Sequence, residues 1–380
     1  MHIRRHGAAL LCAAIAAGLL AGCAKRSSEP LVGVFMPLTG PTADFGLTTR
    51  DGIQLAVDEI NAAGGINGKP MKLVIEDDRG IPAEARTAVT KLVDQSGVVA
   101  LLGDVASSNS LAAAPVAQMR KIPMISPSST NPEVTRAGDN IFRVCFIDPF
   151  QGYVMARFAA EHLNAKTAAV LWDNGSDYST GLAEVFKEEF PKMGGKIVCD
   201  VVFRAGDIDF SSQLTKIRAT NPDVIYVPGY YTEVALIGRK ARELGITVPM
   251  MGGDGWTSAS LIERAGNSLE GCYHSDHYSA DSDEPHVRKF VQSFTKRYGH
   301  APNSLAALGY DAAWILAEAM RRSEDLEPAT IRKQIAQTKD YPAVTGKITI
   351  NPERNAEKSA VVLQIRGKAV HYVTTIEPRK

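Results

Sequence analysis

The chain has 380 residues, and its 42 basic residues (Lys and Arg) balance its 42 acidic residues (Asp and Glu), which gives a formal net charge of zero at pH 7. A neutral chain offers no electrostatic basis for binding nucleic acid, because that affinity comes largely from cations that contact phosphates. The length exceeds what one hydrophobic core usually supports and predicts two lobes.

Two arginines at the start of the chain lead into an apolar run over residues 8–21, which ends in Leu-Ala-Gly-Cys. A short apolar run behind positive charges is typical of a secretory signal peptide and is too short for a membrane span. Its end resembles the lipobox of bacterial lipoproteins, which implies a signal peptide over residues 1–22, a diacylglycerol on the Cys23 thiol and a lipidated tether over residues 23–30. The alternative is an ordinary secretory peptide with a coincidental cysteine. No later stretch approaches a spanning length, so we expect the lipid to be the sole membrane attachment.

Three cysteines remain once Cys12 leaves with the signal peptide and Cys23 is lipidated, namely Cys145, Cys199 and Cys272. An odd number of cysteines outside the cytoplasm leaves at least one thiol unpaired or bonded to another chain. Two interpretations stay open. Cys199 and Cys272 form a disulfide bridge, or the cysteines are small buried thiols.

Strand and helix patterns alternate in the first part of the chain. Continuous apolar runs predict buried strands, and apolar residues spaced three and four apart predict helices. In chain order these are a strand at Leu31–Met36, a helix at Thr49–Asn61, a strand at Met71–Glu76, a helix at Pro82–Gln95, a strand at Val98–Leu102, a helix at Asn109–Met119 and a strand at Pro123–Ile125. This order predicts a parallel, doubly wound α/β sheet with helices on both faces.

The alternation then starts again, which predicts a second α/β unit of similar size. Its expected helices are Pro149–Leu163, Leu182–Met193, Phe210–Ala219 and Thr232–Leu244, and its expected strands are Thr167–Trp172, Ile197–Phe203, Val224–Val227 and Pro249–Gly252. The last part predicts helices at Glu284–Tyr298, Ser304–Arg321 and Ala329–Gln337, followed by strands at Lys347–Ile350, Ala360–Ile365 and Ala369–Thr375.

Polar residues gather directly after several predicted strands, where open α/β sheets bind their ligands. In the first unit, residues 103–110 (GDVASSNS) and 125–135 (ISPSSTNPEVT) are rich in small hydroxyl side chains. Hydroxyls and free backbone amides near helix starts suit a carboxylate, because N–H groups and the helix dipole favour an anion. The alternative is that these serines only cap the N-termini of helices and contact no ligand.

The predicted strand ends of the second unit carry aromatic residues and one isolated acid. Tyr178, Tyr230 and Trp256 each follow a different strand, and Asp254 lies between two glycines. An acid beside aromatic rings suits an ammonium group with an apolar neighbour. The alternative interpretations are core or hinge packing for the aromatic residues and a simple turn for Asp254.

An ordered series of sequence stretches runs from about Leu31 to Val373. The series consists of GVFMPLTGPTADFG, GIQLAVDEINAAGGINGKPMKLVIEDD, GDVASSNS, PMISPSSTNPEVT, VIYVPGYYTEVALIGRKARELGI, MGGDGW and LGYDAAWILAEAM. It resembles the leucine/isoleucine/valine-binding family of type I periplasmic binding proteins, the solute-binding components of ABC importers. The resemblance implies two doubly wound parallel-sheet lobes joined by a three-segment hinge. The expected lobes are residues 31–147 with 279–343, and residues 148–278 with 344–376, with crossings near 147–149, 276–279 and 343–346.

The resemblance also implies an amino-acid site that can be carried over residue by residue. The hydroxyls of Ser107 and Thr130, with the Thr130 amide, match positions that hold an α-carboxylate. Ser129 joins them in the expected cradle, and the Ser128 carbonyl matches an acceptor for the α-ammonium. Asp254 matches the acid that neutralises this ammonium, although the family has Glu there, so the reach is shorter.

The rest of the implied site surrounds the ligand's side chain. Tyr178 and Tyr230 match second-lobe residues that close over the ligand, and Phe45 matches an aromatic residue beside its side chain. Ala106 lies next to the carboxylate cradle and is counted with the ligand-binding residues. Ala106 and Gly80 also stand where the family has a cysteine pair, so no disulfide is expected there.

Three functions compete for this chain. The first is a non-catalytic, monomeric binder that needs no cofactor or metal and delivers an amino acid, with a branched-chain or other apolar side chain, to a membrane permease and its ATPase subunits. The second is an enzyme, which we reject because the chain lacks G-x-S-x-G, H-E-x-x-H and P-loop motifs, and because His274 and His277 fall on opposite faces of a β-like run. The third is a sensor, or a binder of another small polar solute such as an amide or an aromatic carboxylate. For the first function we expect a protein in the periplasm or at the cell surface, anchored by the lipid on Cys23.

Overall fold

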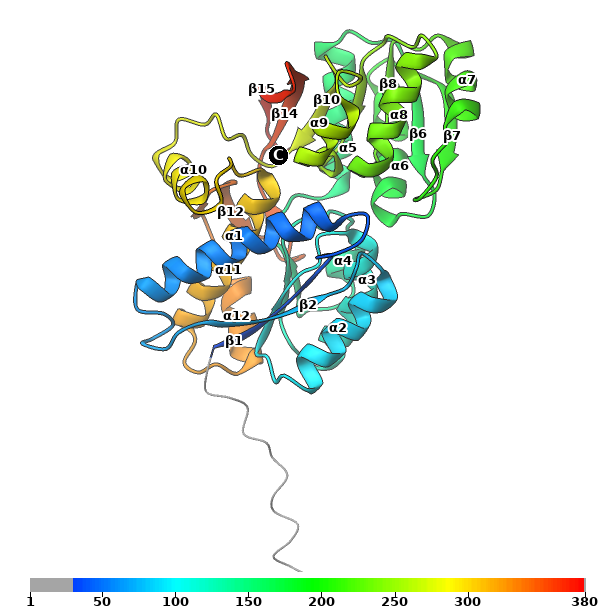
Figure 1. Cartoon of the computed structure of the whole chain (residues 1–380). Helices are drawn as coiled ribbons and strands as arrows, with labels where there is room; N and C mark the ends of the chain where they lie inside the picture. Colours follow the sequence, from blue (N-terminus) through cyan, green and yellow to red (C-terminus); the bar gives the residue numbers. More distant parts are fainter. Residues whose placement is uncertain (1–29, 379–380) are drawn as a thin grey trace, which may run out of the picture.

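The computed structural model describes residues 30–378, which form two α/β lobes (Figure 1). The expected signal peptide, Cys23 and most of the expected tether lie outside the described residues. Across residues 30–378, no helix is both long enough and apolar enough to cross a lipid bilayer. The two parallel-sheet lobes confirm the predicted fold class.

The first lobe is built on a five-stranded parallel sheet in the order β2-β1-β3-β4-β5. Its strands are β1 (Leu31–Met36), β2 (Lys72–Asp77), β3 (Ala100–Leu102), β4 (Met124–Ser126) and β5 (Ile141–Arg143). Its helices are α1 (Ala43–Ala62), α2 (Pro82–Asp94), α3 (Ser107–Met119), α4 (Glu133–Arg136), α11 (Ser304–Arg322) and α12 (Pro328–Ala336). Because the strands are parallel, their carboxyl ends share one edge of the sheet.

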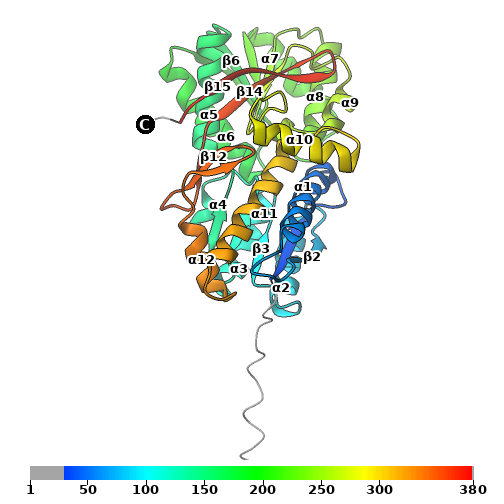
Figure 2. The ribbon, with the colours of Figure 1, turned by 90° about the vertical axis from the view of Figure 1, so that its left-hand side faces the viewer.

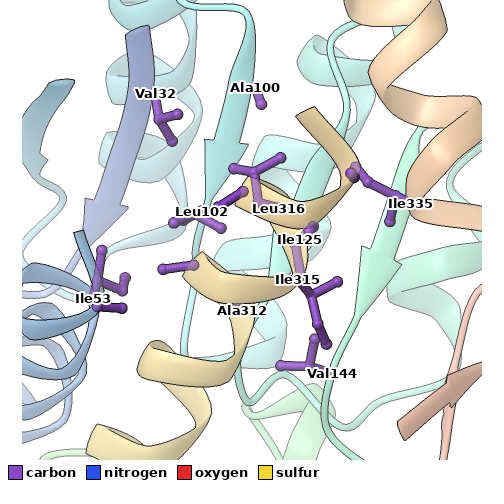
Figure 3. Packing of buried hydrophobic residues seen from close by; sticks show 14 of the residues in the cluster. Val32, Ile53, Ala100, Leu102, Ile125, Val144, Ala312, Ile315, Leu316 and Ile335 are labelled. Carbon is purple, nitrogen blue, oxygen red and sulfur yellow. The ribbon is translucent and has the colours of Figure 1, made fainter. Parts of the chain in front are cut away.

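Both faces of this sheet are covered by helices, which explains why its strands read as continuous apolar runs. On one face α1, α11 and α12 pack over residues such as Val32 and Leu102 (Figure 3). On the other face α2 and α3 pack over Phe35. Helices α1 and α11 lie side by side in both views (Figures 1 and 2). They approach so closely that a Cβ atom at Gly52 would lie 2.0 Å from the Ala306 carbonyl oxygen, so only glycine fits there.

The second lobe is built on a seven-stranded sheet in the order β15-β14-β10-β9-β8-β6-β7. Its strands are β6 (Thr167–Asp173), β7 (Lys196–Phe203), β8 (Val224–Tyr226), β9 (Met250–Gly252), β10 (Tyr273–Asp276), β14 (Ala360–Arg366) and β15 (Ala369–Ile376). The chain also forms α5 (Asp148–Arg157), the π-helical turn η1 (Phe158–His162), α6 (Asp177–Lys192), α7 (Ser211–Thr220), α8 (Tyr231–Glu243), the 3-10 turn η2 (Asp254–Trp256) and α9 (Ala259–Ala265). Strands β6 to β10 are parallel, and the red β14–β15 hairpin adds an antiparallel edge (Figure 1).

Three segments join the lobes. They lead from β5 into α5, from β10 into α10 (Pro285–Tyr298), and from the end of a small third sheet into β14. That third sheet consists of β11 (Tyr341–Ala343), β12 (Gly346–Ile350) and β13 (Ala356–Glu357).

The third crossing differs from the expected position at residues 343–346. Those residues form the turn between β11 and β12, and Ile348 and Ala356 pack into the same core as Val32 of the first lobe. The crossing therefore follows Glu357, and residues 344–357 pack with the first lobe. The apolar alternation of β12 predicted a strand, but alternation cannot show which lobe covers that strand.

The two lobes are in direct contact. Phe45 of the first lobe packs in the hydrophobic cluster of the second lobe, where its ring centroid lies 4.9 Å from that of Tyr231. The Tyr231 hydroxyl donates a hydrogen bond to the Pro41 carbonyl oxygen at 2.8 Å. On another part of the interface, the Asn131 side-chain amide donates to the Asp177 carbonyl oxygen at 2.8 Å. The structure therefore represents a closed arrangement of the lobes.

The three cysteines of the described residues are free thiols. Cys145 and Cys272 are buried, and the Cys272 sulfur accepts a hydrogen bond from the Met250 amide at 3.4 Å. Cys199 is partly buried and forms no bridge with Cys272. Of the two interpretations left open by the sequence, unpaired thiols describe this structure.

Candidate functional site

A buried arginine, Arg143, binds the backbone of the hydroxyl-rich loop that follows β4. The fully buried Arg143 guanidinium donates to the carbonyl oxygens of Ser129 at 2.6 Å and Asn131 at 2.7 Å. The Ser129 hydroxyl in turn lies 2.9 Å from the Asp104 carbonyl oxygen and 2.7 Å from the Ser110 hydroxyl. The Ser129 side chain is thus engaged inside the first lobe. Backbone carbonyls bound to a buried guanidinium fix the shape of this loop.

Ser107, Ser128 and Thr130 come together at the carboxyl edge of β3 and β4. The Ser107 hydroxyl, at the start of α3, accepts a hydrogen bond from the Asn131 amide at 3.2 Å. The Ser128 hydroxyl donates to the Val105 carbonyl oxygen at 3.0 Å. Thr130 is fully buried, and its hydroxyl has no hydrogen-bond partner within residues 30–378. Because a buried hydroxyl without a partner is costly, Thr130 is a strong candidate for a ligand contact.

Asp254 opens the η2 turn after β9 and is surrounded by three donors. Its Oδ1 accepts from the Gln151 side-chain amide at 2.8 Å and from the Tyr178 hydroxyl at 2.9 Å. Its Oδ2 lies 3.0 Å from Nε2 of His277. A carboxylate offers about four lone-pair positions, so one acceptor position of Asp254 remains open. Sequence reasoning identified the acid but neither the amide nor the imidazole that holds it.

Phe45, Tyr230 and Tyr178 form a continuous aromatic wall across the two lobes. The rings of Tyr178 and Tyr230 stack with their centroids 5.0 Å apart and 13° between their planes. Phe45, on α1 of the first lobe, meets Tyr230 edge-on at 5.4 Å. Burial, reinforced by the negative charge of Asp254, raises the pKa of both tyrosines well above the ordinary value. Both phenols therefore stay protonated and can donate hydrogen bonds.

Asp148 is a buried acid at the first crossing that sequence reasoning missed. Its backbone amide donates to the Thr130 carbonyl oxygen at 3.0 Å, which ties the start of α5 to the hydroxyl-rich loop. Neither of its carboxylate oxygens has a hydrogen-bond partner within the described part of the chain. Burial raises the pKa of Asp148 to about 8; the neighbouring Thr130 hydroxyl opposes this increase, and the charge of Asp254 adds to it. In the sequence, Asp148 is distinguished only by the proline that follows it, and an acid before a proline indicates no more than the start of a helix.

Ala106 and Trp256, two other residues that follow predicted strands, already donate hydrogen bonds within the protein. Ala106 precedes α3, and its amide already donates to the Asp104 carboxylate at 2.6 Å. The Trp256 indole N–H donates to the Val227 carbonyl oxygen at 2.9 Å. Trp256 also lines a separate groove of about 800 Å³ that opens between the lobes beside Asp44. It packs in the same hydrophobic cluster as Phe45 and Tyr230 and borders this groove.

The geometry sets the unpaired hydroxyl of Thr130 on the first lobe against the Asp254 carboxylate and two tyrosine rings on the second, and the comparison with known proteins agrees with it. Residues 31–369 match the family described as periplasmic binding protein. The chain belongs to this family. It is 31% identical over 309 residues, or 80% of this chain and 82% of the relative, to a leucine-, isoleucine-, valine-, threonine- and alanine-binding protein of Pseudomonas aeruginosa.

Two solved structures show the same fold as this periplasmic binding protein. The leucine binding protein LivK of Thermotoga maritima is 40% identical, with a TM-score of 0.88 over 92% of this chain and 99% of that chain. The substrate binding protein LivJ of Streptococcus pneumoniae, solved in complex with isoleucine, is 35% identical, with a TM-score of 0.88 over 92% of this chain and all of that chain (100%). These matches confirm the resemblance to solute-binding components and the prediction that the chain is not an enzyme.

Proposed function

We propose that this periplasmic binding protein binds an α-amino acid with a branched-chain or other apolar side chain between its lobes and delivers it to the permease of an ABC importer. The observation that carries the proposal is that a hydrogen-bond donor on one lobe faces an acid on the other. The first lobe offers a buried, unpaired hydroxyl at Thr130, and the second lobe brings the buried carboxylate of Asp254. An α-amino acid carries one group for each side.

The carboxylate end of the ligand would lie against the first lobe. The Thr130 hydroxyl would complete its hydrogen bonding by donating to the ligand, and the Ser107 hydroxyl would add a second donor. Ser107 is also the first residue of the 13-residue helix α3, whose N-terminus favours a negative charge. Ser129, whose hydroxyl is engaged inside the lobe, would contribute by shaping the loop.

The ammonium end would lie among acceptors. An ammonium group has three N–H donors, and the candidate acceptors are the open position on Asp254, the Ser128 carbonyl oxygen and the unpaired carboxylate of Asp148. Charge-assisted hydrogen bonds of this kind are about twice as strong as neutral ones. They would also lower the pKa of Asp148 from its raised value, because a cation favours the ionised acid.

The side chain of the ligand would lie against Phe45, Tyr178 and Tyr230. These rings present apolar faces and belong to both lobes, so an apolar side chain would be covered only when the lobes are closed. The leucine and isoleucine named for the similar solved proteins support this ligand class. Closure on the ligand would be the signal that a permease reads.

Two further properties complete the proposal. The protein would act as a monomer, and the lipid on Cys23 would keep it at a membrane surface in the periplasm or outside the cell. A lipid anchor raises the concentration of a binding protein beside its permease without any additional contact.

Thermal unfolding in the presence of each of the twenty L-amino acids, followed by titration calorimetry, tests the ligand class. Branched-chain amino acids should raise the melting temperature most, because a ligand of the folded state stabilises it by mass action. As a matched comparison, 4-methylpentanoate, which is leucine without its ammonium, should bind at least a hundredfold more weakly. Stabilisation by benzoate or an amide, with none by any amino acid, would contradict the proposal.

A further inference from the structure

His277 occupies a position that connects the hinge to the candidate acid. It lies in the second crossing, and its side chain is fully buried. Its ring stacks on Phe146 of the first crossing, with the centroids 3.7 Å apart and 24° between the planes. Its Nε2 lies 3.0 Å from Oδ2 of Asp254. One imidazole therefore touches two of the three crossings and the acid assigned to the ligand's ammonium.

The contacts of this imidazole fix its protonation state near neutral pH. The Asp254 carboxylate can only accept a hydrogen bond, so Nε2 of His277 must carry the hydrogen. Its Nδ1 has no hydrogen-bond partner within residues 30–378. Burial lowers the pKa of His277, although the charge of Asp254 opposes this change. The ring is therefore neutral at pH 7 and donates one hydrogen bond to the acid.

We propose that His277 is a positioning residue that holds Asp254 ready for the ligand's ammonium, and that a proton on His277 competes with this ammonium for the same carboxylate. The inference rests on the proposed amino-acid function and specifies how the site distinguishes an amino acid from a simple carboxylate. A neutral His277 leaves the full negative charge of Asp254 for the ligand. A protonated His277 neutralises Asp254 and places a second cation beside the ammonium.

Other charged groups surround His277, and the test must keep them constant. They are Asp276, the last residue of β10, and Lys358 at the third crossing, whose charge opposes protonation of the ring, while Asp148 at the start of α5 acts on Asp254. Lys358 in turn faces the buried Asp311 of α11. All four remain in place when His277 alone is substituted, so a difference between the variant and the wild type isolates the imidazole.

The test measures affinity against pH for the L-amino acid that gives the largest thermal stabilisation, using calorimetry on the full chain between pH 4.5 and 8. In the wild type the affinity should fall as the pH drops towards the lowered pKa of His277, by up to about tenfold per pH unit, because one proton is displaced on binding. His277→Gln should have a shallower slope than the wild type, since its amide donates to Asp254 but takes up no proton, and the slope that remains comes from Asp148. His277→Leu, which lacks the donor, should bind more weakly than His277→Gln at pH 7.5.

His274→Gln is the control, because His274 is also buried and lies on β10, where its Nε2 is 3.7 Å from Asp276, without contacting Asp254. It should keep the wild-type pH profile. Parallel profiles for the wild type and His277→Gln would overturn the inference while leaving amino-acid binding intact.

A measurement that leaves His277 in place keeps the inference testable if the His277 variants fail to fold. It uses Asp148→Asn, because the ligand's ammonium would also displace a proton from Asp148. At the pH where the affinity of this variant falls most steeply, binding enthalpies in two buffers with different ionisation enthalpies should reveal proton release with the amino acid and none with 4-methylpentanoate. Equal enthalpies after correction would overturn the inference. A failure of every amino acid to bind would instead overturn the proposed function, and this inference with it.

Discussion

Replacing Asp254 with asparagine tests the ammonium subsite directly, because the substitution keeps the shape of the side chain and removes its charge. Asp254 is 6% exposed and accepts from Gln151 and Tyr178 while facing His277. In the closed protein the ligand's ammonium would be largely removed from water. A buried cation without its acid is strongly destabilised.

The expected loss of affinity follows from breaking this buried pair. Removing one partner of a buried ion pair costs about 3–5 kcal/mol. At about 1.4 kcal/mol per factor of ten, the affinity of Asp254→Asn for an amino acid should fall roughly a hundred- to a few thousand-fold. Titration calorimetry with the preferred amino acid measures this change.

The expected loss of stability is much smaller, although Asp254 does have partners in the protein. The asparagine oxygen can still accept from Gln151 and Tyr178, and its NH₂ group can donate to Nε2 of His277 if the neutral ring moves its proton to the unpartnered Nδ1. The three contacts thus survive as neutral hydrogen bonds, at a cost of about 1 kcal/mol in the free energy of unfolding. Thermal melts without ligand measure this cost.

Asp283→Asn serves as the control, because the Asp283 side chain is 91% exposed and its ion-pair partner is Arg288 of α10, not a residue of the candidate site. It should leave both affinity and melting temperature near their wild-type values. Near-normal amino-acid affinity in a folded Asp254→Asn variant would refute the reasoning. A large loss of stability with normal affinity would identify Asp254 as a purely structural acid.

Four further outcomes are expected. Thr130→Val should weaken amino-acid binding about ten- to a hundredfold in calorimetry and barely change the melting temperature, because the hydroxyl has no partner to lose. Asp148→Asn should change the pH dependence of ligand-free stability. Because the pKa of Asp148 is raised to about 8, its contribution to stability is greatest below pH 4 and falls by up to roughly 5 kcal/mol as the pH rises towards 8, so the difference in melting temperature between the wild type and this variant should change across this range. Tyr231→Phe, which removes the 2.8 Å hydrogen bond to Pro41 across the lobes, should reduce affinity about fivefold and enlarge the liganded protein's radius of gyration in X-ray scattering. Cys23→Ala should abolish incorporation of labelled palmitate in cells, and label retained in this variant would contradict lipidation.

The sequence by itself determined the elements and their order. Continuous apolar runs such as Leu31–Met36 need a sheet covered on both faces, and the alternation with amphipathic helices requires parallel strands with crossovers. The positions of polar residues after strand ends also followed from sequence, since parallel strands bring their carboxyl ends to one edge. That is why Thr130, Tyr178 and Asp254 could be listed together before their contacts were known.

Only the tertiary structure decided what those residues touch. The Ser129 hydroxyl faces Asp104 and Ser110 inside its lobe, although its neighbour Thr130 is left unpaired, and no local pattern separates the two. Gln151 and His277 reach Asp254 from positions 103 and 23 residues away, one just after the first crossing and the other within the second. Secondary structure follows from interactions within a few residues, which the sequence displays. A binding site between lobes depends on side chains brought together by the hinge, and their separation along the chain hides them from any reading of local pattern.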